Sequence, residues 1–146
     1  MNRFVIDASI AIKWVVYEDD SLNALAILQN FPLSSPDLLI AECSNILWKK
    51  VKRAELTTDE AIMAAHLIQR ADVELLPTRR LMDAATRLAI ELDHAAYDCI
   101  YLALAIERDW PFVTADDRFR RKLAQVADAR VSRIVLSIQE ALAMQA

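Results

Sequence analysis

Apolar residues along the chain fall into two patterns, short continuous runs and longer stripes with helical spacing. The short runs, at 3–7, 73–77, 112–114 and 133–137, have the length of buried strands. Stripes with apolar residues three or four positions apart predict helices over 8–16, 22–30, 37–53, 56–71, 78–93, 96–109 and 117–126, and one more at the C-terminus. For helix 37–53 we expect Ser35 as the N-cap and Pro36 at the first helical position, and Thr58 is the expected cap of the next helix.

Short strands separated by helices or helical hairpins predict an α/β sandwich with a mostly parallel central sheet. No linker interrupts the pattern, so we expect a single domain over 1–146. In such folds, ligands bind at the carboxyl ends of the strands. Asp7 ends the first strand and Asp116 follows the strand at 112–114 by two residues, so both side chains should project from that edge.

The composition narrows the class of protein. A chain of 146 residues that is 55% hydrophobic can form one substantial core. Its longest apolar run, at 99–106, is far shorter than the ~20 residues of a membrane span, and the N-terminus lacks the pattern of a signal peptide. We therefore expect a cytoplasmic protein without membrane association, in which Cys43 and Cys99 are reduced core residues.

The chain contains no glycine, which excludes a Walker-type phosphate loop and a glycine-rich dinucleotide motif. Its net charge of −4 argues against a protein that coats nucleic acid by electrostatic attraction alone. A protein that contacts phosphate through bound cations remains compatible with both features.

Two further acids lie beside apolar residues. Glu42 has Leu38 and Ile46 one turn away on either side, and Asp98 opens an apolar helix. Burying several carboxylates is costly unless a cation compensates their charge. Because the donors are all oxygens, with no His or Cys set at zinc spacing, Mg²⁺ or Mn²⁺ is the expected ion. Such an ion typically bridges carboxylates to a phosphate, which indicates phosphoryl transfer.

Each acid also has a purely structural interpretation when it is taken alone. Asp7 and Asp116 occupy positions suited to helix caps, and Asp98 suits the first turn of a helix. Glu42 could pair with Lys49 at the margin of a buried face. The joint placement of the four acids is what favours a shared metal site.

Four blocks of sequence, in order, resemble those of PIN-domain proteins, and specifically the VapC-type toxins of bacterial and archaeal toxin-antitoxin pairs. "FVIDASIAIKW" resembles the opening strand with the first acid, and "PDLLIAECSNILW" the helix that carries the second. "HAAYDCIYLALA" is similar to the block around the third acid, and "FVTADDRF" to the terminal block, in which the acid directly follows Thr-Ala. The resemblance places the acids at Asp7, Glu42, Asp98 and Asp116, with Asp117 as a variable neighbour.

This resemblance implies a PIN-like three-layer α/β/α sandwich and a metal-dependent endoribonuclease that hydrolyses RNA phosphodiester bonds with Mg²⁺ or Mn²⁺ as cofactor. Asp7, Asp98 and Asp116 would be the most direct metal ligands. Glu42 would be a ligand through water or would orient the attacking water. The resemblance also implies a homodimer and a cognate VapB-type antitoxin.

The residues around the acids have two interpretations each. Ser9 either contacts phosphate or a metal-bound water, or it caps a helix; Asn45 either orients Glu42 or touches RNA, or it is simply exposed. Thr114 supports the carboxylates or is an ordinary strand residue. The basic run from Arg118 to Lys122 attracts the RNA backbone or forms a solvated helix face. His94 could line the cleft, although a loop or capping role is favoured.

Two other functions are alternatives to a metal-dependent nuclease. A receiver-like signalling domain also binds Mg²⁺ with strand-end acids, but it needs an adjacent acid pair after the first strand and a late strand-end lysine, which this sequence lacks. A PIN module that binds RNA or a partner without catalysis is the other alternative.

Four aromatic residues on or near the early helices either anchor a partner or belong to the core: Trp14, Tyr17, Phe31 and Trp48.

Overall fold

The computed structural model describes residues 3–144 of the chain. Its centre is a five-stranded sheet in the order β3-β2-β1-β4-β5, in which all neighbouring strands are parallel. The strands are β1 (Phe4–Ile6), β2 (Leu33–Pro36), β3 (Val73–Leu76), β4 (Phe112–Val113) and β5 (Val135–Leu136). The predicted α/β fold with a mostly parallel sheet is therefore confirmed.

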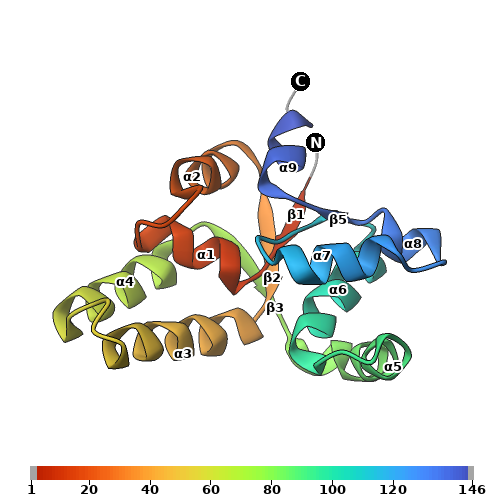
Figure 1. Ribbon diagram of the computed structural model, residues 1–146, viewed down its shortest axis with the longest axis horizontal. Helices are drawn as coiled ribbons and strands as arrows, with labels where there is room; N and C mark the ends of the chain where they lie inside the picture. Colours follow the sequence, from red (N-terminus) through yellow and green to blue (C-terminus); the bar gives the residue numbers. More distant parts are fainter. Residues whose placement is uncertain (1–2, 145–146) are drawn as a thin grey trace.

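Helices cover both faces of the sheet and form the outer layers of the sandwich (Figure 1). On one side lie α1 (Ala8–Val15), α2 (Ser21–Asn30), α3 (Leu38–Lys52) and α4 (Thr58–Arg70). On the other lie α5 (Met82–Leu92), α6 (Ala96–Arg108), α7 (Asp117–Ala124) and α8 (Ala129–Ser132). A 3-10 turn, Thr78–Leu81, leads into α5, and α9 (Ile138–Ala143) packs against α2. This arrangement confirms the three-layer α/β/α architecture.

The core surrounds β1 and α6. Phe4, Val5 and Ile6 are completely buried, which explains why this strand is a continuous apolar run. In α6 the five residues 101–105 are all buried, and the helix contacts β1, β2 and β4. Burying large apolar side chains contributes roughly 1.5–3 kcal/mol each. This packing anchors α6, so Asp98 in its first turn has a fixed place at the edge of the sheet.

Within residues 3–144, four residues adopt the left-handed backbone conformation that glycine takes most readily, in a chain that has no glycine. Asp93 and Asp109 end α5 and α6, and Asp20 precedes α2. Aspartate tolerates this conformation because its short polar side chain forms local hydrogen bonds. Ala54, in the turn after α3, has a φ of 60° and no such compensation, so it carries roughly 1–2 kcal/mol of strain.

The start of α3 differs from the prediction. Ser35 and Pro36 were expected to begin a helix, but they belong to β2, which the hydrophobic pattern did not reveal. This strand is completely buried between β1 and β3, and its serine hydroxyls are satisfied there. Ser35 Oγ donates to the Ile6 carbonyl at 2.9 Å, and Ser34 Oγ donates to Glu74 Oε1 at 3.1 Å. Hydrogen bonding thus allows polar residues in a central strand.

Two smaller differences concern helix starts. Thr57, not Thr58, caps α4, and it forms a capping box in which Glu60 binds the Thr57 amide. The short helix α8 was not predicted; it begins after Asp128, whose carboxylate accepts from the Arg130 amide.

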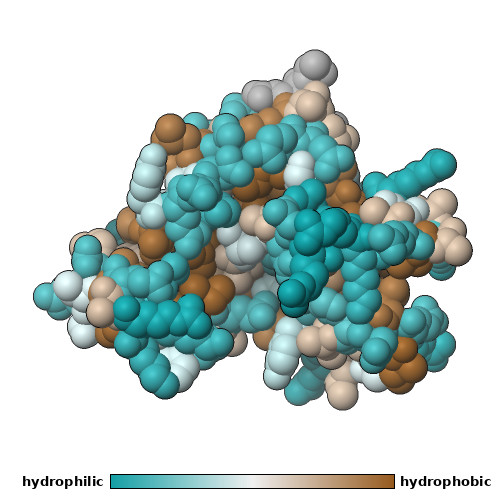
Figure 2. Space-filling model, viewed as in Figure 1, coloured by the Kyte–Doolittle hydropathy of each residue, from teal (hydrophilic) through white to brown (hydrophobic). Residues whose placement is uncertain are grey.

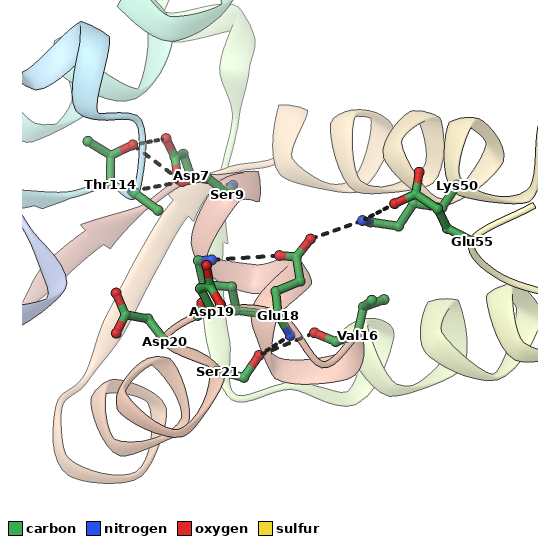
Figure 3. A network of polar contacts seen from close by, with 12 residues as sticks. Asp7, Ser9, Val16, Glu18, Asp19, Asp20, Ser21, Lys50, Glu55 and Thr114 are labelled. Atoms are coloured by element: carbon green, nitrogen blue, oxygen red, sulfur yellow. Dashed lines mark hydrogen bonds and ion pairs between the residues drawn. The ribbon is translucent and has the colours of Figure 1, made fainter. Parts of the chain in front are cut away.

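An ion pair connects the turn after α1 to α3: Lys50 Nζ lies 2.9 Å from a Glu18 oxygen (Figure 3).

Both cysteines are buried and free, as predicted. Burial raises the pKa of the Cys43 thiol to about 12 and that of Cys99 to about 11, so both remain protonated at neutral pH.

Between residues 3 and 144, none of the helices combines the length and the hydropathy that crossing a membrane requires.

Candidate active site

Asp7 is the centre of the polar network at the carboxyl end of β1. It occupies the N-cap of α1, and its Oδ1 accepts hydrogen bonds from the Ser9 amide at 3.1 Å and from Ser9 Oγ at 2.5 Å. Its Oδ2 accepts from Thr114 Oγ1 at 2.6 Å (Figure 3). Asp7 therefore caps α1, as one interpretation predicted, and also joins β1 to the segment after β4; metal binding by Asp7 stays a prediction.

The environment of Asp7 opposes its ionisation. Only 7% of the residue is exposed. Burial, with smaller contributions from the negative charges of Asp98 and Glu42, raises the pKa of Asp7 to about 7. The hydrogen bonds from Ser9 and Thr114 act in the opposite direction. Hydroxyls, rather than a cationic side chain, therefore provide the main stabilisation of the ionised form.

Glu42 lies half-buried on α3, at the margin of the buried face as predicted. Burial raises its pKa, and the charge of Asp98 adds to this effect, while the nearby Tyr101 hydroxyl opposes it. That hydroxyl is buried near Glu42 without reaching a well-formed hydrogen bond, and it has no partner among the described residues. The charges of Glu42 and Asp98 thus act on Asp7, and that of Asp98 acts on Glu42, although the three residues come from separate elements.

Asp98 lies in the first turn of α6 and makes a contact that the sequence did not predict. Its Oδ2 is 2.6 Å from Nε2 of His94. The His94 ring stacks on Phe119 of α7, with ring centroids 4.3 Å apart. His94 lies in the loop between α5 and α6, which agrees with the favoured loop role, and it also contacts a candidate ligand. Little in the sequence indicates this contact. Residues four positions apart face each other within a helix, but His94 precedes α6, so its spacing to Asp98 does not imply contact.

Asp116 is the N-cap of α7, and its Oδ1 accepts from the Phe119 amide at 3.0 Å. Its own amide donates to Thr114 Oγ1 at 3.2 Å. These bonds attach Asp116 to the network around Asp7 through Thr114. The neighbouring Asp117 instead pairs with Arg120 on the exposed side of α7. The adjacent aspartates therefore have different surroundings, and it is Asp116 that caps α7.

The remaining predicted residues divide into two groups. Ser9 and Thr114 belong to the network: Ser9 Oγ also accepts from the Ala115 amide at 2.9 Å, and the two hydroxyls lie 3.3 Å apart. Asn45 and Arg118 are exposed, and neither makes a side-chain hydrogen bond or ion pair within residues 3–144. The structure thus places the two hydroxyl residues beside the acids and leaves the other two free to meet a ligand.

The donor set fits a hard divalent cation in its chemistry. All four candidate side chains are carboxylates, and those of Asp7 and Glu42 have raised pKa values because of burial and mutual repulsion. However, no three His, Cys, Asp or Glu side chains in the described part of the chain are close enough to form a ready-made metal site. Side-chain rotation would be needed to gather the acids around one ion.

Comparison with families of known proteins matches residues 4–123 to the PIN domain. Because this match covers most of the chain, the chain belongs to the PIN domain family. No curated protein matches it in sequence. The strand order agrees with this assignment and not with a receiver-like domain, whose order is 2-1-3-4-5. The receiver-like alternative was therefore wrong.

Several solved structures have a similar fold. PAE2754 from Pyrobaculum aerophilum is 19% identical over 99% of this chain and 89% of that chain, with a TM-score of 0.73. VapBC2 from Rickettsia felis, bound to a DNA fragment from their promoter, is 15% identical over 92% and 98%, with a TM-score of 0.63. VapC20 from Mycobacterium tuberculosis, a sarcin-ricin loop cleaving toxin, is 13% identical over 81% and 93%, with a TM-score of 0.64. At these identities, the similarity establishes the fold.

Proposed function

We propose that this protein is a metal-dependent endoribonuclease, the VapC-type toxin of a type II toxin-antitoxin pair. The observation that carries the proposal is the position of Asp7, buried at the carboxyl end of β1 in a PIN domain with the charges of Glu42 and Asp98 nearby. Buried carboxylates that repel one another are poised to bind a cation. The similarity of the fold to VapBC2 and VapC20 supports the toxin class.

In this proposal Asp7, Asp98 and Asp116 hold Mg²⁺ or Mn²⁺, and Glu42 binds through water or orients the attacking water. When bound, such an ion supplies positive charge that polarises water and stabilises the charge developing on the scissile phosphate. Ser9 and Thr114 fix the orientation of Asp7 through their hydrogen bonds to its two oxygens. Burial raises the pKa values of both Asp7 and Glu42, so no single general base is assigned.

The exposed side of α7 supports the choice of RNA as substrate. Arg120 is paired with Asp117, and Lys122 Nζ donates to the Asp93 carbonyl at 2.9 Å. Arg118 and Arg121, two and five residues after Asp116, are exposed and make no ion pair within residues 3–144. Figure 2 shows a hydrophilic surface over α7. We infer that these two arginines bind backbone phosphates next to the acids.

Exposed apolar residues suit the proposed VapB-type antitoxin and the second copy of a homodimer. Tyr17 is 85% exposed and Trp48 is 56% exposed, so both are available to a partner. Trp14 and Phe31 belong to the fold instead: Trp14 Nε1 donates to the Ala24 carbonyl at 2.9 Å, and Phe31 stacks near Phe4. Of the four aromatic residues, two are therefore candidates for partner contacts.

The proposal is tested by incubating the purified protein, free of antitoxin, with structured RNAs and Mg²⁺ or Mn²⁺. We expect cleavage that EDTA stops, and that falls at least 100-fold in Asp7→Asn and Asp98→Asn. Hydrolysis by water leaves no 2′,3′-cyclic phosphate and continues when the 2′-hydroxyl at the cut site is removed. Cleavage that survives both substitutions would contradict the mechanism, and its absence in the wild type would favour a PIN module that only binds RNA or a partner.

A further inference from the structure

His94 contacts one of the proposed ligands directly. Its Nε2 lies 2.6 Å from Asp98 Oδ2, and 19% of the His94 side chain and 33% of the Asp98 side chain are exposed. An ionised carboxylate can only accept hydrogen bonds, so Nε2 is the donor in this contact whenever Asp98 is ionised. The bond occupies one oxygen of Asp98 and leaves Oδ1 without a partner in residues 3–144. One oxygen is therefore held in place while the other is free to bind.

The ring of His94 also reaches the element that carries Asp116. It stacks on Phe119, which is 1% exposed and therefore cannot move aside easily. The amide of Phe119 donates to Asp116 Oδ1 at 3.0 Å. One imidazole thus contacts a proposed ligand on α6 and a residue that binds a second proposed ligand at the start of α7.

The backbone before α6 holds His94 in this position. Its amide donates to the Ala89 carbonyl at 3.1 Å, and the preceding Asp93 ends α5 in the left-handed conformation. Lys122 of α7 donates to the Asp93 carbonyl at 2.9 Å. The loop between α5 and α6 is therefore attached to α7 by a hydrogen bond as well as by the aromatic stack.

We propose that His94 is a positioning residue that orients Asp98 for the metal ion through its hydrogen bond, while the stack on Phe119 holds the imidazole ring in place. This inference rests on the proposed function of the site. Hydrogen bonds to ligating carboxylates fix their orientation, and removing such a partner commonly lowers metal affinity or activity by about 10- to 100-fold. Because Asp98 lies on α6 and Phe119 on α7, a residue that contacts both elements is held firmly enough for this task.

Two variants separate the hydrogen bond from the stack. His94→Phe keeps an aromatic ring against Phe119 but cannot donate to Asp98, whereas His94→Gln keeps a donor and loses the ring. We expect the dissociation constant for Mn²⁺ to rise about 10- to 100-fold in His94→Phe and to stay within about threefold of the wild type in His94→Gln. At saturating Mn²⁺ the KM for RNA should be unchanged in both. His94→Leu repeats the first test if His94→Phe does not fold.

A spectroscopic measurement distinguishes positioning from direct ligation. The chain has two histidines, and the other, His66, is exposed on α4. Pulsed electron paramagnetic resonance of bound Mn²⁺ should show no directly coordinated imidazole nitrogen, and His66→Gln serves as the matched control. A coordinated nitrogen that disappears in His94→Gln would overturn the proposal, as would unchanged affinity in His94→Phe or equal losses in both variants. If the wild type neither binds Mn²⁺ nor cleaves RNA, it is the proposed function that fails.

Discussion

Thr114 donates a 2.6 Å hydrogen bond to Asp7, a residue 107 positions earlier in the chain. The bond is buried and joins the segment after β4 to the end of β1. Because β1 and β4 are neighbouring parallel strands, their carboxyl ends meet at one edge of the sheet. The same hydroxyl also accepts from the Asp116 amide, so it connects two of the proposed ligands.

Replacing Thr114 with valine should weaken the site without changing its shape. Without this donor, Asp7 loses a group that lowers its pKa, and we expect activity to fall about 10- to 100-fold. The free energy of unfolding should drop by about 1.5–3 kcal/mol at pH 8, where the hydrogen bond is to a charged group. Urea unfolding and RNA cleavage measure the two effects. Thr114→Ser keeps the hydroxyl, and failure of serine to restore activity would contradict this role.

The stability of the metal-free protein should depend on the ionisation of Asp7. The pKa of Asp7 is raised from 3.8 to about 7 in the fold, so the folded state retains a proton that the unfolded state releases. This contribution to stability is complete below pH 4 and is lost as the pH rises through 7. It amounts to about 4 kcal/mol at most, at about 1.4 kcal/mol for each pKa unit.

Asp7→Asn tests this dependence, because asparagine does not ionise. In EDTA, the difference in the free energy of unfolding between pH 5 and pH 8 should shrink in this variant, and the variant should be the more stable protein at pH 8. Asp59→Asn, at an exposed position on α4, should leave the difference unchanged. An identical pH dependence in wild type and Asp7→Asn would show that Asp7 ionises without penalty.

The two unpaired arginines of α7 should contribute to RNA binding rather than to the chemical step. In Arg118→Gln/Arg121→Gln, we expect KM to rise about tenfold at low salt and kcat to change little. The slope of log affinity against log salt should decrease in magnitude by about 1.4, since each phosphate contact on a single strand contributes about 0.7. The control Arg70→Gln/Arg133→Gln removes the same charge from exposed positions that precede β3 and β5. Equal effects in the two pairs would indicate a general charge effect.

Ala54→Gly should stabilise the protein. Ala54 has a φ of 60°, which costs an L-residue roughly 1–2 kcal/mol and glycine almost nothing. Glycine also adds freedom to the unfolded chain, so the expected net gain is about 0.5–1 kcal/mol by urea unfolding. The same change at Ala84, exposed within α5, should instead destabilise by about 1 kcal/mol. A loss of stability at Ala54 would argue against the left-handed turn.

The sequence predicted those parts of the fold in which hydrophobic periodicity is strong. β1 and α6 are continuous apolar segments, so the places of Asp7 and Asp98 at their ends could be predicted. β2 could not, because Ser34 and Ser35 make a central strand look like a loop until their hydrogen-bond partners are known. Position along the chain is predictable from such patterns, whereas side-chain partners across the sheet are not.

The same limit applies to the candidate site. Only the family resemblance separates Asp116 from Asp117 in sequence, because only Asp116 follows Thr-Ala. The structure gives the two residues different partners, and the metal-binding role of Asp116 stays a prediction. His94 was not predicted to contact Asp98, because that contact depends on the left-handed turn at Asp93 and on packing against Phe119. Whether the four acids gather around one ion also depends on side-chain rotation, which no sequence pattern describes.

Calorimetric titration of the metal-free protein with Mn²⁺ tests the central claim most directly, because it asks whether the acids form one metal site. We expect saturable binding in the wild type that is abolished in Asp7→Asn and Asp98→Asn and weakened at least tenfold in Asp116→Asn. Asparagine also caps helices well, so Asp116→Asn should remain folded. Asp117→Asn should bind like the wild type. The absence of saturable binding in the wild type, or equal binding in all these variants, would contradict a shared metal site.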